Sequence, residues 1–148
     1  MNTQATRTIV IGVDGSSDAA DAMNWAIDEA QRQQMKMLLV HGVGIGAAAA
    51  SPYGSGLVLE QLEEVGRLIL DEALAFVRAK GIEAEGRIEI GSSAHALIEA
   101  SRGADLLVVG SRGHGGFAGL LLGSVSTACV HHAHCPVVVV RREEHKAA

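Results

Sequence analysis

The chain has 148 residues, a net charge of −5 and few aromatic side chains, and 48% of its residues are apolar. That length suits one domain with one core, so we expect a single domain over 1–148, folded from about residue 7 to residue 141. An acidic chain argues against a nucleic-acid partner, because nucleic-acid phosphates favour a basic surface.

Targeting and membrane signals are weak. The start of the chain lacks the basic residues and apolar run of a signal peptide. The segment 113–140 carries no Asp, Glu, Lys or Arg and is long enough to span a bilayer. Glycines, histidines and Pro136 interrupt it, so we interpret it as a glycine-rich loop followed by a buried helix and strand. Two cysteines make no disulfide framework, and we expect a cytoplasmic protein with no membrane segment.

The first half of the chain predicts a strand, a helix and a second strand. The short apolar run Thr8–Asp14 is typical of a strand buried on both faces. Ser16 or Ser17 can cap the helix that follows, whose apolar stripe continues to Ala30. Residues 35–43 predict the second strand.

A loop and a long helix come next. Residues 44–56 are rich in Gly, Ala, Ser and Pro and predict a flexible loop. A helix is expected from Leu57 to Lys80, with Gly81 ending it. We expect this helix to bury one apolar stripe: Leu62, Val65, Ile69, Ala73, Phe76 and Val77.

The second half continues the alternation of strands and helices. Residues 82–90 alternate between apolar and polar, which predicts a strand with one wet face at a sheet edge. Alternating strands and helices predict a parallel sheet between helices. The remaining expected elements are a helix capped by Ser92 or Ser93, a buried strand over 104–110, a helix over 124–133 and a strand over Val137–Val140.

Two polar strand ends suggest a binding site. In open parallel sheets, ligands bind beyond the carboxyl ends of strands, where the winding reverses. The first strand ends at Asp14, and the fourth ends at Gly110, which opens a glycine-dense loop leading to a helix near Ser124. Glycine allows a close backbone approach, and a helix N-terminus favours phosphate, with the hydroxyls of Ser124 and Ser126 as further donors. Residue types alone leave phosphate binding and a purely structural glycine loop both open.

Two other constellations are less convincing. The set Cys129, His131, His132, His134 and Cys135 contains metal-ligating types, but a helix and a strand would point them apart, and Cys129 continues an apolar stripe. We therefore expect packing and no protein metal site. A hydrolase triad from Ser111, His114 and Asp14 lacks the nucleophile-elbow pattern.

The glycine spacing narrows the choice. The spacing resembles the ATP-binding signature of the universal stress protein family: two residues separate Gly110 from Gly113, and nine separate Gly113 from Gly123-Ser124. The resemblance covers nearly the whole chain and includes the segments 10–16, 107–110 and 135–137. It implies a three-layer α/β/α fold, adenine nucleotide α-hydrolase-like, with a five-stranded parallel sheet of order 3-2-1-4-5.

The resemblance also implies roles for particular residues. Asp14 would hold the ribose, and the backbone of Gly42 would contact adenine, although the family often has valine there. Arg112 and His114 are additions in this chain. Their side chains are long enough to reach phosphates, but we expect solvated loop residues. Mg²⁺ would bind through the phosphates. The residues implied to cradle the phosphates of ATP are Gly110, Gly113, Gly123, Ser124 and Val125.

The final valine run predicts an assembly. A bare apolar edge strand is an aggregation hazard, and a second copy covers it most simply. The resemblance likewise implies a homodimer through Val137–Val140. We expect an ATP-binding regulator of stress or dormancy without fast turnover, since no phosphate-binding lysine is present. Two alternatives remain open: a slow ATPase or phosphotransferase using His114 or Asp14, and a dimeric interaction module selective for AMP or cyclic AMP.

Overall fold

The strands form one parallel sheet. The computed structural model describes residues 6–44, 55–111 and 122–141. Five strands lie in the order β3-β2-β1-β4-β5, and all neighbouring pairs run parallel. The predicted order 3-2-1-4-5 is confirmed, and the winding reverses between β1 and β4. The strands are β1 (Thr8–Gly12), β2 (Lys36–Val43), β3 (Ala84–Ile90), β4 (Leu106–Gly110) and β5 (Val137–Val140).

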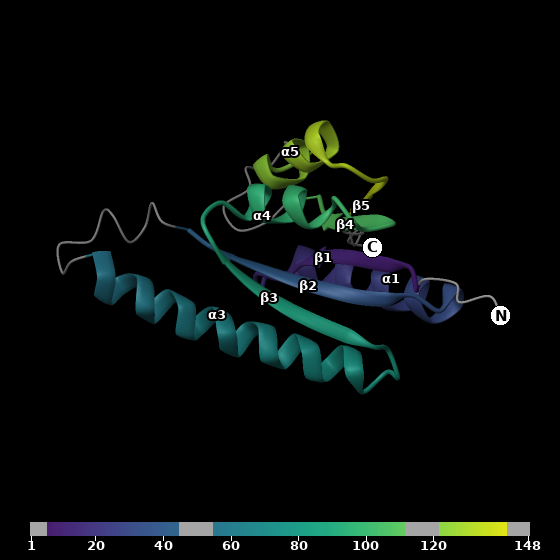
Figure 1. Ribbon diagram of the computed structural model, residues 1–148, viewed down its shortest axis with the longest axis horizontal. Coiled ribbons are helices and arrows are strands. Elements are labelled where there is room, and N and C mark those ends of the chain that lie inside the picture. Colours follow the sequence, from purple (N-terminus) through teal and green to yellow (C-terminus); the bar gives the residue numbers. More distant parts are fainter. Residues whose placement is uncertain (1–5, 45–54, 112–121, 142–148) are drawn as a thin grey trace, which may run out of the picture.

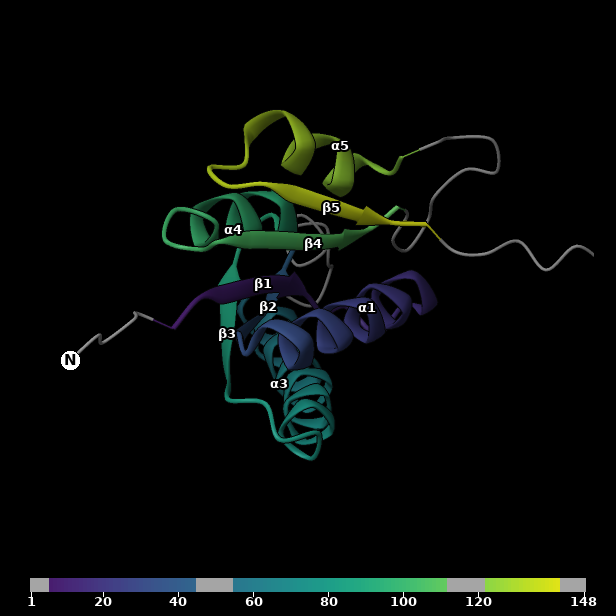
Figure 2. The same cartoon turned by 90° about the vertical axis from the view of Figure 1, so that its right-hand side faces the viewer.

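Helices cover both faces of this sheet, as the three-layer prediction required. On one face, α1 (Ser17–Gln33) packs on β1, β4 and β5, and α3 (Ser55–Arg78) packs on β2 and β3. On the other face, α4 (Ser93–Ala100) packs on β1 and β2 and contacts α5 (Ser124–His132). Figure 2 shows the two layers of helices with the strands between them.

The central strands are buried on both sides. Ile9 and Ile11 point toward α1 and α3, whereas Val10 points toward the α4 layer, and all three are fully buried. Alternation of side chains along a strand sends neighbours to opposite faces, so an unbroken apolar run is what a two-sided core needs. In the described part of the chain, no helix combines the length and hydropathy needed to cross a bilayer.

Serine caps fix where two helices begin. The Oγ of Ser16 accepts a hydrogen bond from the backbone N–H of Ala19 at 3.1 Å, and the Oγ of Ser92 accepts from that of His95 at 3.0 Å. Each bond satisfies a backbone donor that a helix start would otherwise leave unpaired. The first of the two cap candidates was therefore right at both places. Gly81, with φ of +81°, follows the end of α3.

One prediction about α3 is wrong. Val65 and Phe76 do not point into the core: their side chains are 54% and 47% exposed. Val77 is buried as expected, and Ile69 and Ala73 pack against the core. The other buried positions are Leu70 and Leu74, which lay outside the expected stripe. The helix is therefore rotated relative to the expected stripe, so that only part of that stripe faces the sheet.

Candidate functional site

The two polar strand ends lie beside each other. Ile11 of β1 pairs with Val108 of β4, so the two parallel strands end at the same edge of the sheet, a few residues beyond this pair. The segment after β1 leads into α1 (Figure 2), and β4 is followed in the chain by α5. The winding reverses between these two strands, which is where open parallel sheets bind ligands.

Gly110 brings the end of β4 against the first turn of α1. A Cβ at this position would lie 2.8 Å from the carbonyl oxygen of Asp18 and 3.0 Å from its carbonyl carbon. Those atoms are backbone, so a side chain could be placed only by moving the helix. Glycine at this position therefore sets the distance between α1 and β4.

Asp14 is oriented by its own turn. Its Oδ1 accepts a hydrogen bond from the backbone N–H of Ser16 at 2.8 Å, and Ser16 is the residue that caps α1. An Asp side chain that bonds two residues ahead stabilises such a turn. The carboxylate is half-buried at the site edge. It is thus held in one place at the carboxyl end of β1.

The start of α5 is tied to the end of β4. The carbonyl oxygen of Ser111 accepts from the N–H of Gly123 at 2.6 Å and from the hydroxyl of Ser126 at 3.0 Å. The N–H of Ser111 in turn donates to the carbonyl of Val140 at 2.9 Å. The two ends of the predicted phosphate loop are therefore clamped together.

Ser124, the first residue of α5, faces solvent in this arrangement. The helix begins after Gly123, which contributes no side-chain cap, and Ser124 is exposed whereas Val125 is half-buried. Free N–H groups at such a start can hold an anion. Gly113, Arg112 and His114 lie outside the described residues.

Ser126 has a structural task that the sequence did not reveal. It is buried, and its hydroxyl lies 3.0 Å from the carbonyl oxygens of both Ser111 and Gly123. We predicted a phosphate donor at this position. The hydroxyl proton is instead directed to backbone carbonyls, so Ser126 holds the base of the loop, and its contact with a ligand stays a prediction.

Gly42 is explained by packing. A Cβ here would lie 2.7 Å from the Cα of Ser93 and 3.0 Å from its backbone nitrogen. Residue 42 is therefore glycine because the start of α4 crosses β2 at this point. The sequence resemblance showed only that the family often has valine here, whereas the structure gives a reason for glycine within the fold. The predicted backbone contact with adenine stays a prediction.

His41 is a residue that sequence reasoning passed over. Its Nδ1 lies 2.7 Å from the carbonyl oxygen of Val13, so the imidazole donates a hydrogen bond to the residue before Asp14. The other side of the ring packs on α3, where a Cβ on Gly66 would lie 2.5 Å from its Cδ2. A histidine at the end of a buried strand was the available signal. It joins β1, β2 and α3 directly beside the candidate site.

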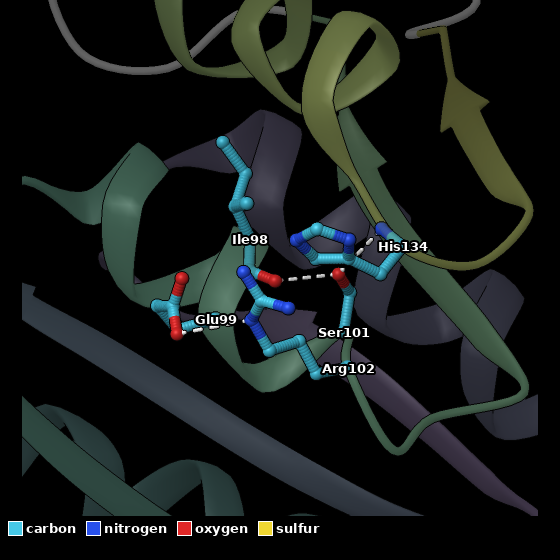
Figure 3. Close-up of polar contacts among 5 residues, drawn as sticks. All are labelled: Ile98, Glu99, Ser101, Arg102 and His134. Carbon is cyan, nitrogen blue, oxygen red and sulfur yellow. Dashed lines mark hydrogen bonds and ion pairs between the residues drawn. The ribbon is translucent and has the colours of Figure 1, made fainter.

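The cysteine and histidine set near α5 is held by packing and backbone bonds. Cys129 is fully buried, and this burial raises the pKa of its thiol to about 11. The backbone N–H of His134 donates to the hydroxyl of Ser101 at 2.9 Å, and that hydroxyl donates to the carbonyl of Ile98 at 2.6 Å (Figure 3). Among the described residues, no three His, Cys, Asp or Glu side chains converge well enough to hold a metal ion.

A cavity of about 320 Å³ lies at the opposite end of the sheet. It is lined by the amino-terminal ends of β1, β2 and β3 and by the end of α4, including Lys36, Arg87 and Glu99. The candidate site lies at the carboxyl ends of β1 and β4. This cavity is therefore separate from the candidate site.

Comparison with known proteins places this fold and motif in a family. A profile of the universal stress protein family matches residues 5–141. A universal stress protein of Mycolicibacterium smegmatis is 39% identical over 135 residues, which is 90% of this chain but 45% of that protein. The chain thus spans about half the length of this relative.

Solved structures agree. UspA, a universal stress protein from Lactobacillus plantarum, superposes with a TM-score of 0.78 at 26% identity, covering 93% of this chain and all of that one. A universal stress protein crystallised in complex with cAMP gives a TM-score of 0.67 at 30% identity, covering 93% of this chain and 98% of that one. The family match over most of the sequence, the sheet order and these likenesses together establish that the chain belongs to the universal stress protein family.

Proposed function

We propose that this protein binds an adenine nucleotide between the carboxyl ends of β1 and β4, with ATP and Mg²⁺ as the primary ligand. Binding would make it a nucleotide-dependent regulator in stress or dormancy. The observation that carries the proposal is the clamp at Ser111, which holds both ends of the glycine-rich loop and the start of α5 beside Asp14.

Each part of the site suits one part of the ligand. The carboxylate of Asp14 can accept hydrogen bonds from ribose hydroxyls. The N–H groups at the start of α5, with the hydroxyl of Ser124, can hold phosphate oxygens, and Gly123 carries no side chain that would cover them. Mg²⁺ keeps several waters and needs few protein ligands, so it can enter with the phosphates.

A second candidate function is selectivity for AMP or cyclic AMP. It is favoured by the solved relative at 30% identity that was crystallised with cAMP. Calorimetric titration of the full chain with ATP, AMP and cyclic AMP, each with and without Mg²⁺, separates the two. Tighter binding of ATP that depends on Mg²⁺ supports the primary proposal, and tighter binding of cyclic AMP or AMP supports the second.

Regulation rather than catalysis fits the residues available. The loop has no lysine to neutralise charge developing on a transferred phosphoryl group. The remaining candidates for such chemistry are Asp14 and His114. Phosphate release measured under single-turnover conditions tests this: turnover that disappears in His114→Ala would favour a slow ATPase.

Asp14 gives the sharpest variant for ribose binding. Asp14→Ala removes a charged acceptor, and hydrogen bonds to charged groups contribute about 1.5–3 kcal/mol, so we expect nucleotide affinity about 10–100-fold weaker. Asp28→Ala removes an exposed carboxylate elsewhere on α1 and serves as the matched control. Equal affinities for the two variants would contradict the role given to Asp14.

We also propose a homodimer through β5. In the described structure this strand pairs only with β4, and all four of its valines are half-buried. The carbonyls of Pro136 and Val140 accept bonds from β4, so the backbone of Val139 faces the open edge. Val139→Pro removes one edge donor while sparing those bonds. Sedimentation should show loss of the dimer, and an unchanged dimer would rule out pairing through this strand.

A further inference from the structure

The outward side of α3 carries large apolar side chains in solvent. Leu57, Val65, Leu68 and Phe76 are 56%, 54%, 67% and 47% exposed. Figure 1 shows α3 on the α1 side of the sheet, along β3, with no other described element beyond its outward side. We call these four residues the α3 stripe. Single exposed apolar residues need no explanation, but four on one helix form a patch.

The stripe forms a face of its own. At 100° per residue, its four positions fall within an arc of about 100° around the helix. Leu70, Leu74 and Val77, which pack on the sheet, occupy the opposite side. The helix is therefore apolar on two faces, and the sheet uses only one of them.

The apolar positions of the α3 stripe are arranged symmetrically about its midpoint. Leu57 and Phe76 lie equally far from the midpoint between Gly66 and Arg67, and so do Val65 and Leu68. Gln61 and Glu72, the exposed polar positions between them, are also related in this way. Apolar positions thus exchange with apolar ones, and polar positions with polar ones.

We propose that the α3 stripe is a self-association surface on which a second copy of this chain docks with its own α3 antiparallel. In a two-fold interface, residue i of one copy meets residue j of the other, and j meets i. A dyad at the midpoint of the stripe places Leu57 opposite Phe76 of the second copy and Val65 opposite Leu68. A partner of a different sequence would not require this symmetry.

Polar groups favour the same arrangement. The antiparallel pair brings the amide N–H₂ of Gln61 opposite the carboxylate of Glu72 of the second copy, a donor facing an acceptor. A parallel pair about a dyad along the helices would set each residue against itself. Glu72 would then face Glu72, and like charges in contact repel.

This surface is distinct from the edge at β5. The α3 helix packs on β2 and β3, at the far end of the sheet from β5. Both contacts can therefore form in one assembly, and the α3 contact does not rest on nucleotide binding. One helix pair is at the small end of specific interfaces, so the association should be weak and depend on protein concentration.

A charge-swap experiment tests the register. Both substitutions are made in Val139→Pro protein, which lacks the β5 contact. Val65→Glu and Leu68→Lys each place a charge against an apolar partner, so each variant alone should lose the concentration-dependent increase in sedimentation coefficient that Val139→Pro protein shows. In an equimolar mixture of the two, the carboxylate introduced at position 65 meets the ammonium introduced at position 68, and the opposite pair stays apolar. The mixture should regain the increase.

Controls make the outcome decisive. Val130→Glu, made in the same protein, changes another exposed valine, on α5, and should sediment as Val139→Pro protein does. Circular dichroism should show that both stripe variants are folded, since the substituted side chains are exposed. A Val139→Pro protein whose sedimentation coefficient does not rise with concentration overturns the proposal. A mixture that stays dissociated overturns the antiparallel register.

Discussion

Two regions of this protein differ in how closely neighbouring elements pack against them. At the carboxyl edge of the sheet, backbones meet so closely that Gly42 and Gly110 leave no room for a methyl group beside α4 and α1. On the outward side of α3, large side chains such as Leu68 stand in solvent with no described element against them. In the first region the described chain fills the space around its own backbone, whereas in the second the apolar side chains are left without a packing partner in the described chain.

This difference in packing suits the two regions to different functions. Close backbone packing at the carboxyl edge holds Asp14, Ser111 and the start of α5 in fixed places, which a binding site requires. The α3 stripe contributes little to the fold, so its residues are available for a partner. Substitutions in the first region should change stability, and those in the second should change assembly.

The largest expected effect is at Gly42. Gly42→Ala places a Cβ against the backbone of Ser93, so the start of α4 must move, and overpacking of this kind costs about 1–3 kcal/mol. Gly44→Ala is the matched control, because no atom lies within 4 Å of a Cβ there. Urea denaturation should show a lower free energy of unfolding for Gly42→Ala alone. Equal losses for both would mean that close approach is not what selects glycine at position 42.

A smaller effect is expected at Ser126. Ser126→Ala removes a buried hydroxyl that donates to backbone carbonyls at the clamp, and such a bond contributes about 1 kcal/mol. The variant should also bind nucleotide more weakly, because the start of α5 is then tied to Ser111 only through the N–H of Gly123. Thr127→Ala, at the exposed neighbouring position, should change neither quantity. Full nucleotide affinity in Ser126→Ala would show that the clamp is not needed for the site.

The smallest effect is expected on α3. Leu68→Gln replaces an exposed side chain, and surface changes of this kind usually alter the free energy of unfolding by less than about 0.5 kcal/mol. Leu70→Gln, two residues away on the buried face, should lower it by several times as much. Thermal unfolding of dilute protein compares them. A similar loss in both variants would mean that the α3 stripe belongs to the core after all.

Much of the fold could be predicted from local patterns. Unbroken apolar runs predicted the buried strands, the alternation over 82–90 predicted an edge strand, and serines predicted the caps. The rotation of α3 could not be predicted, because apolar residues occur on two faces. Tertiary contacts decide it: the ring of His41 lies against Gly66, and a Cβ on Gly86 would lie 2.8 Å from Leu74.

The candidate site divides in the same way. Its position followed from the strand order, because the reversal between β1 and β4 brings Asp14 and Ser111 to one edge. The tasks of Gly42 and Ser126 did not follow, since their partners are backbone atoms of Ser93 and Ser111 that are distant in sequence. Spacing in a motif locates such residues but does not reveal what they contact.

The most direct test of the proposed site is the affinity for ATP and Mg²⁺ of Ser124→Glu compared with Ser124→Gln. Ser124 is exposed at the first position of α5, where a carboxylate favours the helix dipole and so should not lower stability. That same carboxylate would repel phosphate. We predict that calorimetry gives affinity at least about 10-fold weaker for Ser124→Glu than for Ser124→Gln, with equal thermal stability. Equal affinities, or no binding of ATP by the unmodified chain at millimolar concentration, would contradict a phosphate site at the start of α5.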